Sequence, residues 1–196
     1  MAYDQSVIAV FSDHRTVEAA MTKLTAGEIT TGDLSIVGKG HQADERNIGF
    51  YHADGRIKFW GRRGAFWGGL WDLFPGGVSL TLPIVGHIMV LGYLASIVVS
   101  AVEGAILNGG LSALGAALYS TGIPKDSVRQ YELAITAGGF LIVVHGTGTE
   151  LARARTVLGF CNPTRLDFHG DAAVPPSPSG ISSPAGNIDS SALVSG

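Results

Sequence analysis

Ser6-Val-Ile-Ala-Val-Phe11 is short, apolar and rich in β-branched residues, which is typical of a buried strand. Ser12-Asp13 follows it and supplies N-cap chemistry for an amphipathic helix over 14–26. A Thr-Thr-Gly-Asp turn then leads into a second apolar strand over 34–37. The first ordered unit is therefore predicted to be β-α-β.

The same pattern returns in the second half of the chain. The sequence predicts an apolar strand over 140–145, a helix over 149–158 and a last short strand over 165–168. A further helix opens at Pro124 and runs to the Gly138-Gly139 stop. Two split β-α-β units predict an α+β, ferredoxin-like domain with four antiparallel strands and helices on one face.

The chain is predicted to divide into four parts. Residues 1–62 form the first half of the ferredoxin-like domain, with an extra hairpin over 48–60 around an Asp-Gly turn. Residues 124–170 form the second half, and 63–123 between them form an apolar, glycine-rich helical insertion. Residues 171–196 are rich in Pro, Ser, Gly and Ala, and this composition predicts a disordered tail.

The insertion carries a membrane signal. No Asp, Glu, Lys or Arg lies between Asp72 and Glu103, nor between Glu103 and Lys125. The 21 residues of 82–102 match the length of a bilayer-spanning helix, about 20 residues. Basic residues at both ends favour a hairpin that enters and leaves on the same side, so we expect the protein at the cytoplasmic face of the membrane, in contact with lipid. Aromatic residues ahead of the apolar stretch are predicted to lie at the membrane interface: Trp60, Phe66, Trp67, Trp71 and Phe74.

Small residues recur at every fourth position of the insertion. In a continuous helix, this spacing lines one face with small side chains on which another helix packs closely. The row consists of Ala101, Ala105, Gly109, Ala113 and Ala117. It predicts helix packing in a homo-oligomer. Because hydropathy does not separate a bilayer from an apolar protein assembly, membrane insertion and burial within an oligomer both stay open.

Two ionisable residues interrupt the apolar stretch, His87 and Glu103. Ionisable residues in such surroundings are candidates for a polar site. In the alternative interpretation, Glu103 marks a water-exposed bend and His87 bonds to a backbone carbonyl of a neighbouring helix.

Catalytic and nucleic-acid signatures are weak or missing. His145 and His169 end two predicted strands with Asp167 nearby, but their spacing does not supply the three or four converging ligands of a metal site. The loop over 146–150 lies between a strand and a helix but lacks the Lys of a phosphate-binding loop, so a Thr N-cap explains it. No catalytic set, metal or cofactor is predicted, and a net charge of -3 argues against nucleic acid.

Several motifs resemble a bacterial family of general-stress membrane proteins, of the DUF1269 type. The motifs are Phe66-Trp-Gly-Gly-Leu-Trp71, Gly122-Ile-Pro-Lys-Asp126, Tyr131-Glu132 and Gly138-Gly-Phe-Leu-Ile-Val-Val144. The resemblance covers residues 5 to 168 and implies a membrane protein, while it implies no mechanism because the family has no assigned activity. Asp72 departs from the pattern, and the tail lies outside it.

The sequence thus predicts a non-enzymatic, membrane-associated or self-assembling scaffold or anchor protein. In an alternative hypothesis, the assembled helices enclose an apolar chamber for lipid or quinone and serve a partner respiratory enzyme. A third hypothesis is a metal-binding protein or enzyme that uses His145 and His169. The end of the tail carries Ile188, Leu193 and Val194, which form a candidate docking peptide for a protein partner.

Overall fold

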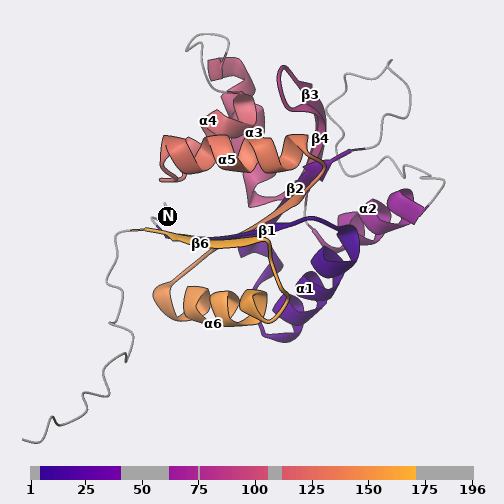
Figure 1. The fold of residues 1–196 in the computed structure, drawn as a ribbon, viewed down its shortest axis with the longest axis vertical. Helices are drawn as coiled ribbons and strands as arrows, with labels where there is room; N and C mark the ends of the chain where they lie inside the picture. Colours follow the sequence, from indigo (N-terminus) through magenta and orange to yellow (C-terminus); the bar gives the residue numbers. More distant parts are fainter. Residues whose placement is uncertain (1–4, 41–61, 75, 106–111, 171–196) are drawn as a thin grey trace, which may run out of the picture.

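A computed structural model describes residues 5–40, 62–74, 76–105 and 112–170. Within them the chain forms an α+β fold with one six-stranded antiparallel sheet and six α-helices (Figure 1). The strand order is β3-β4-β2-β5-β1-β6. The elements are β1 (Ser6–Phe11), α1 (His14–Ala26), the short 3-10 helix η1 (Thr31–Asp33), β2 (Leu34–Lys39), α2 (Arg62–Leu73), β3 (Gly77–Leu82), β4 (Gly86–Gly92), α3 (Tyr93–Ala105), α4 (Ala113–Ser120), α5 (Lys125–Thr136), β5 (Phe140–His145), α6 (Gly148–Gly159) and β6 (Arg165–His169).

The predicted elements of both β-α-β units are confirmed. β1, α1 and β5 have the predicted bounds. β2 ends two residues later than predicted, and the bounds of α6 and β6 and the start of α5 agree within one residue. Asp13 caps α1, because its Oδ1 accepts hydrogen bonds from the backbone N–H groups of Arg15, at 2.7 Å, and Thr16, at 3.3 Å. α6 begins with a capping box between Thr147 and Glu150, as expected from a capping rather than a phosphate-binding loop. The predicted hairpin over 48–60 and the tail over 171–196 lie outside the described residues.

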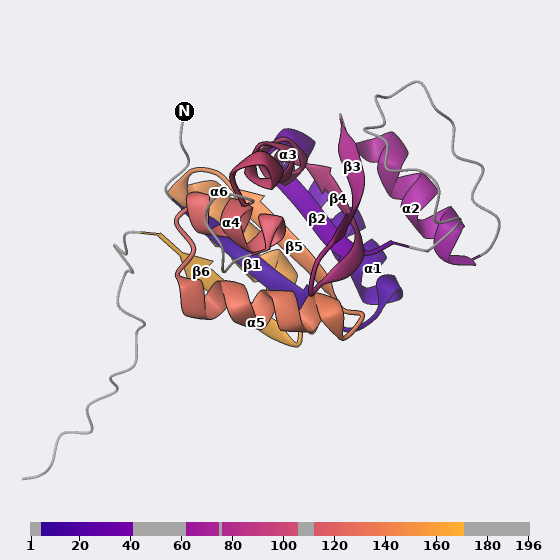
Figure 2. The same ribbon diagram turned by 90° about the horizontal axis from the view of Figure 1, so that it is seen from above.

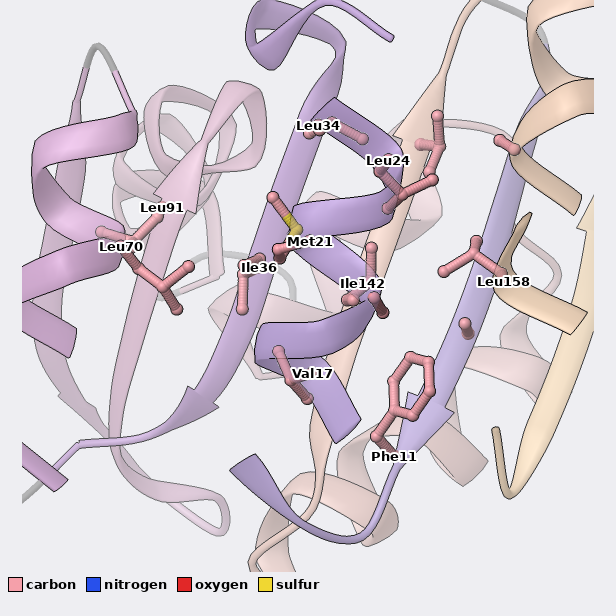
Figure 3. Close-up of a cluster of buried hydrophobic side chains, with 14 of the residues drawn as sticks. Phe11, Val17, Met21, Leu24, Leu34, Ile36, Leu70, Leu91, Ile142 and Leu158 are labelled. Carbon is pink, nitrogen blue, oxygen red and sulfur yellow. The ribbon is translucent and has the colours of Figure 1, made fainter. Parts of the chain in front are cut away.

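Helices cover both faces of the sheet, which gives the domain two hydrophobic cores. α1, α2 and α6 pack on one face, where Met21 and Leu24 of α1 lie over Ile36 and Ile142 (Figure 3). α3, α4 and α5 pack on the other face, as the view from above shows (Figure 2). Along β1, alternate side chains enter the two cores, so the whole strand is buried. The prediction of helices on one face only was therefore wrong.

The predicted spanning helix over 82–102 is also wrong. The segment contains the end of β3, the strand β4 and the first part of α3. No helix in the described ranges has both the length and the apolarity that a membrane crossing requires. The membrane-spanning hairpin of 63–123 is thus replaced by α2, a β-hairpin and two short helices.

The physical reason lies in burial. β4 is a central strand whose residues 88–91 face the two cores, and such a strand has the same unbroken hydropathy as a buried helix. Its ends are marked by Gly86 and Gly92, whose φ angles are 87° and 85°. Positive φ is a conformation that favours glycine, so the two glycines stop regular structure on either side of β4.

The row of small residues does not lie on one helix. Ala101 and Ala105 belong to α3, Ala113 and Ala117 belong to α4, and Gly109 lies outside the described residues. Ala113 and Ala117 are buried in the core between α3, α4, α5 and the sheet. Their close packing is therefore within one chain. Ala101 is half-buried at the margin of the same core, and the Ala105 side chain is outside the description.

The aromatic cluster is likewise part of the fold. Phe66, Trp67 and Phe74 are buried in the core beneath α1, and the Phe66 ring contacts the rings of His14 and Phe140 edge-on. Trp71 is half-buried against the same core. Trp60 lies outside the described residues. The described members of the cluster anchor α2 to the sheet instead of facing a membrane interface.

Candidate functional site

The outer edge of β3 is the first candidate site. β3 is the terminal strand of the sheet in the part of the chain that the structure describes, and it pairs only with β4 there. Its sequence, Gly77-Val-Ser-Leu-Thr-Leu82, contains no charged residue and no proline. Sheet edges usually carry charges or prolines that prevent pairing with another strand. This edge lacks both devices, so it is suited to strand addition.

The two faces of β3 have different chemistry. Val78, Leu80 and Leu82 lie on the face of the α3–α5 core, where Val78 and Leu82 are buried. Ser79 and Thr81 alternate with them on the opposite face. β3 therefore presents an apolar row on one face and a hydroxyl row on the other.

His87 of β4 organises the hydroxyl row. Its Nε2 lies 3.1 Å from Ser79 Oγ, and its Nδ1 lies 3.0 Å from Thr81 Oγ1. Partial burial lowers the pKa of His87 below its usual value. The alternative interpretation, in which His87 bonds to a backbone carbonyl of a neighbouring helix, is wrong, because both ring nitrogens lie beside hydroxyls of the adjacent strand β3. The side chain of Glu103 lies outside the description.

The hairpin that joins β3 to β4 ends in a strained, exposed tip. Ile84 is 84% exposed and has a φ of 77°, and the N–H of Val85 donates a 2.9 Å hydrogen bond to Pro83 O. This three-residue γ-turn with positive φ is a rare conformation, and a β-branched side chain makes it more costly. An exposed apolar residue held in a strained turn is a candidate contact with another molecule.

The hairpin tip gives a prediction with two opposite effects. Ile84→Asn is expected to raise the free energy of unfolding by about 1 kcal/mol, because Asn tolerates positive φ better than a β-branched residue. It is also expected to weaken any association that uses the tip, because it removes exposed apolar surface. Chemical denaturation of the dilute protein measures the first effect and light scattering the second. A variant with lower stability would contradict the assignment of strain.

A polar cluster at the end of β1 is the second candidate. In register across the sheet, Ser6 lies opposite His145 of β5 on one side and opposite His169 of β6 on the other. Tyr131 of α5 donates a 2.7 Å hydrogen bond to Asp167 Oδ2, and its oxygen lies 2.6 Å from His169 Nε2. Because the tyrosine proton is used on Asp167, His169 Nε2–H is the donor to the tyrosine oxygen.

This cluster holds α5 against the edge strand β6. Arg165 Nε also donates to Asp167 Oδ2. The pKa of Tyr131 is raised, mainly by burial and secondly by the hydrogen bond to the Asp167 carboxylate, so the phenol stays protonated. Within the described residues, no group of three His, Cys, Asp or Glu side chains is arranged to hold a metal ion.

His145 and His169 are brought to the same end of the sheet but not together. β1 lies between their strands, so they are separated by two strand spacings, roughly 10 Å. The structure thus confirms their common location at one end of the sheet. Sequence reasoning missed Ser6 and Tyr131, because only the register and the α5 packing bring them to these histidines.

His145 is a buried histidine with unsatisfied nitrogens. The residue is 1% exposed, and neither ring nitrogen has a hydrogen-bond partner among the described residues. The ring packs edge-on against Tyr93 at a centroid distance of 5.1 Å. Burial lowers the pKa of His145 to about 4.

This burial predicts acid sensitivity. Between pH 6.5 and about 4 the unfolded chain binds a proton at His145 that the folded chain does not, so stability is lost as the pH falls through this window. The loss attributable to His145 is about 3 kcal/mol. His145→Phe is expected to flatten the dependence of unfolding free energy on pH in this window, as measured by urea denaturation. An NMR titration with an ordinary midpoint near pH 6.5 for His145 would contradict the prediction.

No protein-family model, curated protein or solved structure matches the chain.

Proposed function

We propose that the protein is a non-enzymatic, self-assembling scaffold whose copies associate through the outer edges of β3. The observation that carries the proposal is the uncharged edge of β3, which is the terminal strand of the described sheet. An antiparallel edge offers backbone N–H and C=O groups that another strand satisfies. The exposed Ile84 at the end of the same hairpin adds apolar surface beside this edge.

The sequence of β3 is complementary to itself. If two copies pair antiparallel about a twofold axis at Leu80, Leu80 lies opposite Leu80 of the second copy. In this register Val78 lies opposite Leu82, and Ser79 lies opposite Thr81. Apolar residues therefore meet apolar residues on the core face, and hydroxyls meet hydroxyls on the other. No like charges face one another, so a second copy fits this edge without repulsion.

The proposed contact is small. One pair of edge strands buries less than the roughly 1,200 Å² of a standard-size interface. We therefore expect a dimer with a dissociation constant in the micromolar range, which dissociates on dilution.

Light scattering coupled to size-exclusion chromatography tests the proposal. The average mass is expected to rise from one chain toward two as the loaded concentration increases from about 1 to about 500 μM, a range that brackets a micromolar dissociation constant. A monomer mass throughout this range would refute self-assembly.

We further propose that β6, β1, β5 and β2 form a ferredoxin-like domain extended by the β3–β4 hairpin. The support is their order: numbered within the two β-α-β units, these four strands run 4-1-3-2. In this scheme α1 and α6 are the two crossover helices of the domain, both on one face. Four hypotheses stay predictions from the sequence. They are membership of the general-stress family, location at the cytoplasmic face of the membrane, the chamber for lipid or quinone, and the docking peptide of the tail.

A further inference from the structure

A groove between α1 and α2 lies on the opposite face of the sheet from the polar cluster. Its volume is about 620 Å³, within the range of small-molecule sites. The floor is apolar and consists of Met21, Phe66 and Leu70, which are buried. Figure 3 labels Met21 and Leu70, on the two helices that form the groove. The rim on α1 carries polar side chains: His14, Arg15, Glu18, Thr22 and Thr25.

Gly69 keeps this groove open. A Cβ placed on Gly69 would meet no atom within 4 Å in the part of the chain that the structure describes, although Gly69 lines the groove. Packing among the described residues therefore does not require glycine there, and glycine in a helix interior costs about 1 kcal/mol relative to alanine. Gly68 is equally free of neighbours but does not line the groove. The two glycines thus form a matched pair.

The rim carries one charge of each sign. Arg15 and Glu18 are three residues apart on α1, so their side chains lie on the same face of the helix. In the described part of the chain, neither takes part in an ion pair. A ligand that offers a carboxylate to Arg15 and an ammonium group to Glu18 would satisfy both, and its apolar body would lie on the floor.

We propose that the α1–α2 groove binds a small zwitterion with a large apolar side chain, of the class of free aromatic or long aliphatic amino acids. The apolar floor selects the side chain, and the two opposite charges on the rim select the zwitterionic end. This site is separate from the β3 edge, so the result of the binding test does not depend on whether the protein self-assembles.

L-Tryptophan is the probe for the first experiment, with binding followed by ligand-observed saturation-transfer NMR. Gly69→Leu is expected to abolish the signal, because a leucine side chain at this position fills the groove. Gly68→Leu, which has the same effect on helix propensity, is expected to bind as the wild-type protein does. Absence of wild-type binding at 5 mM ligand, a concentration well above about 1 mM, the weak end of specific affinities, would overturn the proposal. Equal binding by the two glycine variants would also overturn it.

The second experiment tests the charges. Tryptamine lacks the carboxylate and indole-3-propionate lacks the ammonium group, so each is expected to bind about two- to fivefold more weakly than L-tryptophan, the size of an exposed ion pair. Arg15→Ala is expected to remove the preference over tryptamine, and Glu18→Gln the preference over indole-3-propionate. Equal affinities of the wild-type protein for all three probes would overturn the assignment of a zwitterion.

Discussion

Gly92→Ala is expected to lower the free energy of unfolding by about 3–5 kcal/mol, near the upper end for single substitutions. Gly92 has a φ of 85°, and a Cβ built on it would lie 2.0 Å from the backbone oxygen of Leu34. The contact is with backbone of the adjacent strand β2, so no side-chain rotation relieves it. Either β4 or the start of α3 must shift, and both pack in the core. Urea denaturation measures the loss.

Gly86→Ala is the matched control. Gly86 lies at the other end of β4 with a φ of 87°, but a Cβ there would meet no atom of the described residues within 4 Å. The cost of placing alanine at a positive φ is therefore similar in the two variants, but Gly86→Ala causes no steric clash. The expected loss in the free energy of unfolding is about 1 kcal/mol. An unfolded Gly92→Ala beside a folded Gly86→Ala would agree with the prediction. Equal, small losses in the two variants would contradict the close approach of β4 and β2.

Leu80→Lys is expected to raise the dissociation constant of the dimer at least tenfold, about 1.4 kcal/mol. In the proposed register two lysines would lie directly opposite each other across the twofold axis, and like charges in this position are destabilising. Sedimentation or light scattering at several concentrations measures the change. Leu133→Lys, at a leucine of α5 that is 64% exposed, is the control and is expected to leave the dimer intact.

Charge reversal separates repulsion from damage to the fold, since Leu80 is half-buried against the core. Leu80→Glu is expected to weaken the dimer as Leu80→Lys does, because two like charges again face each other. An equimolar mixture of the two variants is expected to form a heterodimer, because opposite charges then face each other across the axis. A mixture that stays monomeric would show that Leu80 acts through the fold and not through the proposed edge.

Local signals predicted the two β-α-β units well. β1 and β5 were predicted to the residue because each is a short apolar run with polar or glycine residues at its ends, and α1 because an amphipathic pattern follows a cap. The insertion failed because its main signal was hydropathy, which is the same for a buried strand and a buried helix. Two local signals pointed to the hairpin: the alternation of apolar and hydroxyl residues over 78–82, and the glycines at 86 and 92.

The candidate sites depended on information that the sequence does not hold locally. That β3 is an outer strand follows from the order of the sheet, which is set by contacts between distant segments. Tyr131 and Asp167 are 36 residues apart and meet only because α5 lies across β6. The predicted small-residue row failed for the related reason that its members belong to two separate helices, α3 and α4, and so share no helical face. Periodicity has meaning only within one continuous element.

Disulfide trapping at the β3 edge tests self-assembly through this edge most directly. With Cys161 replaced by Ser, Leu80→Cys is expected to form a covalent dimer under mild oxidation, because opposite residues of paired strands lie about 4.5–5.5 Å apart between Cα atoms, within disulfide range. Ser79→Cys alone is expected to give no covalent dimer, since residue 79 of one copy lies opposite residue 81, and not residue 79, of the other. Ser79→Cys mixed with Thr81→Cys is expected to form a covalent dimer. Failure of Leu80→Cys to cross-link, or equally efficient cross-linking by Ser79→Cys alone, would contradict the proposed edge pairing.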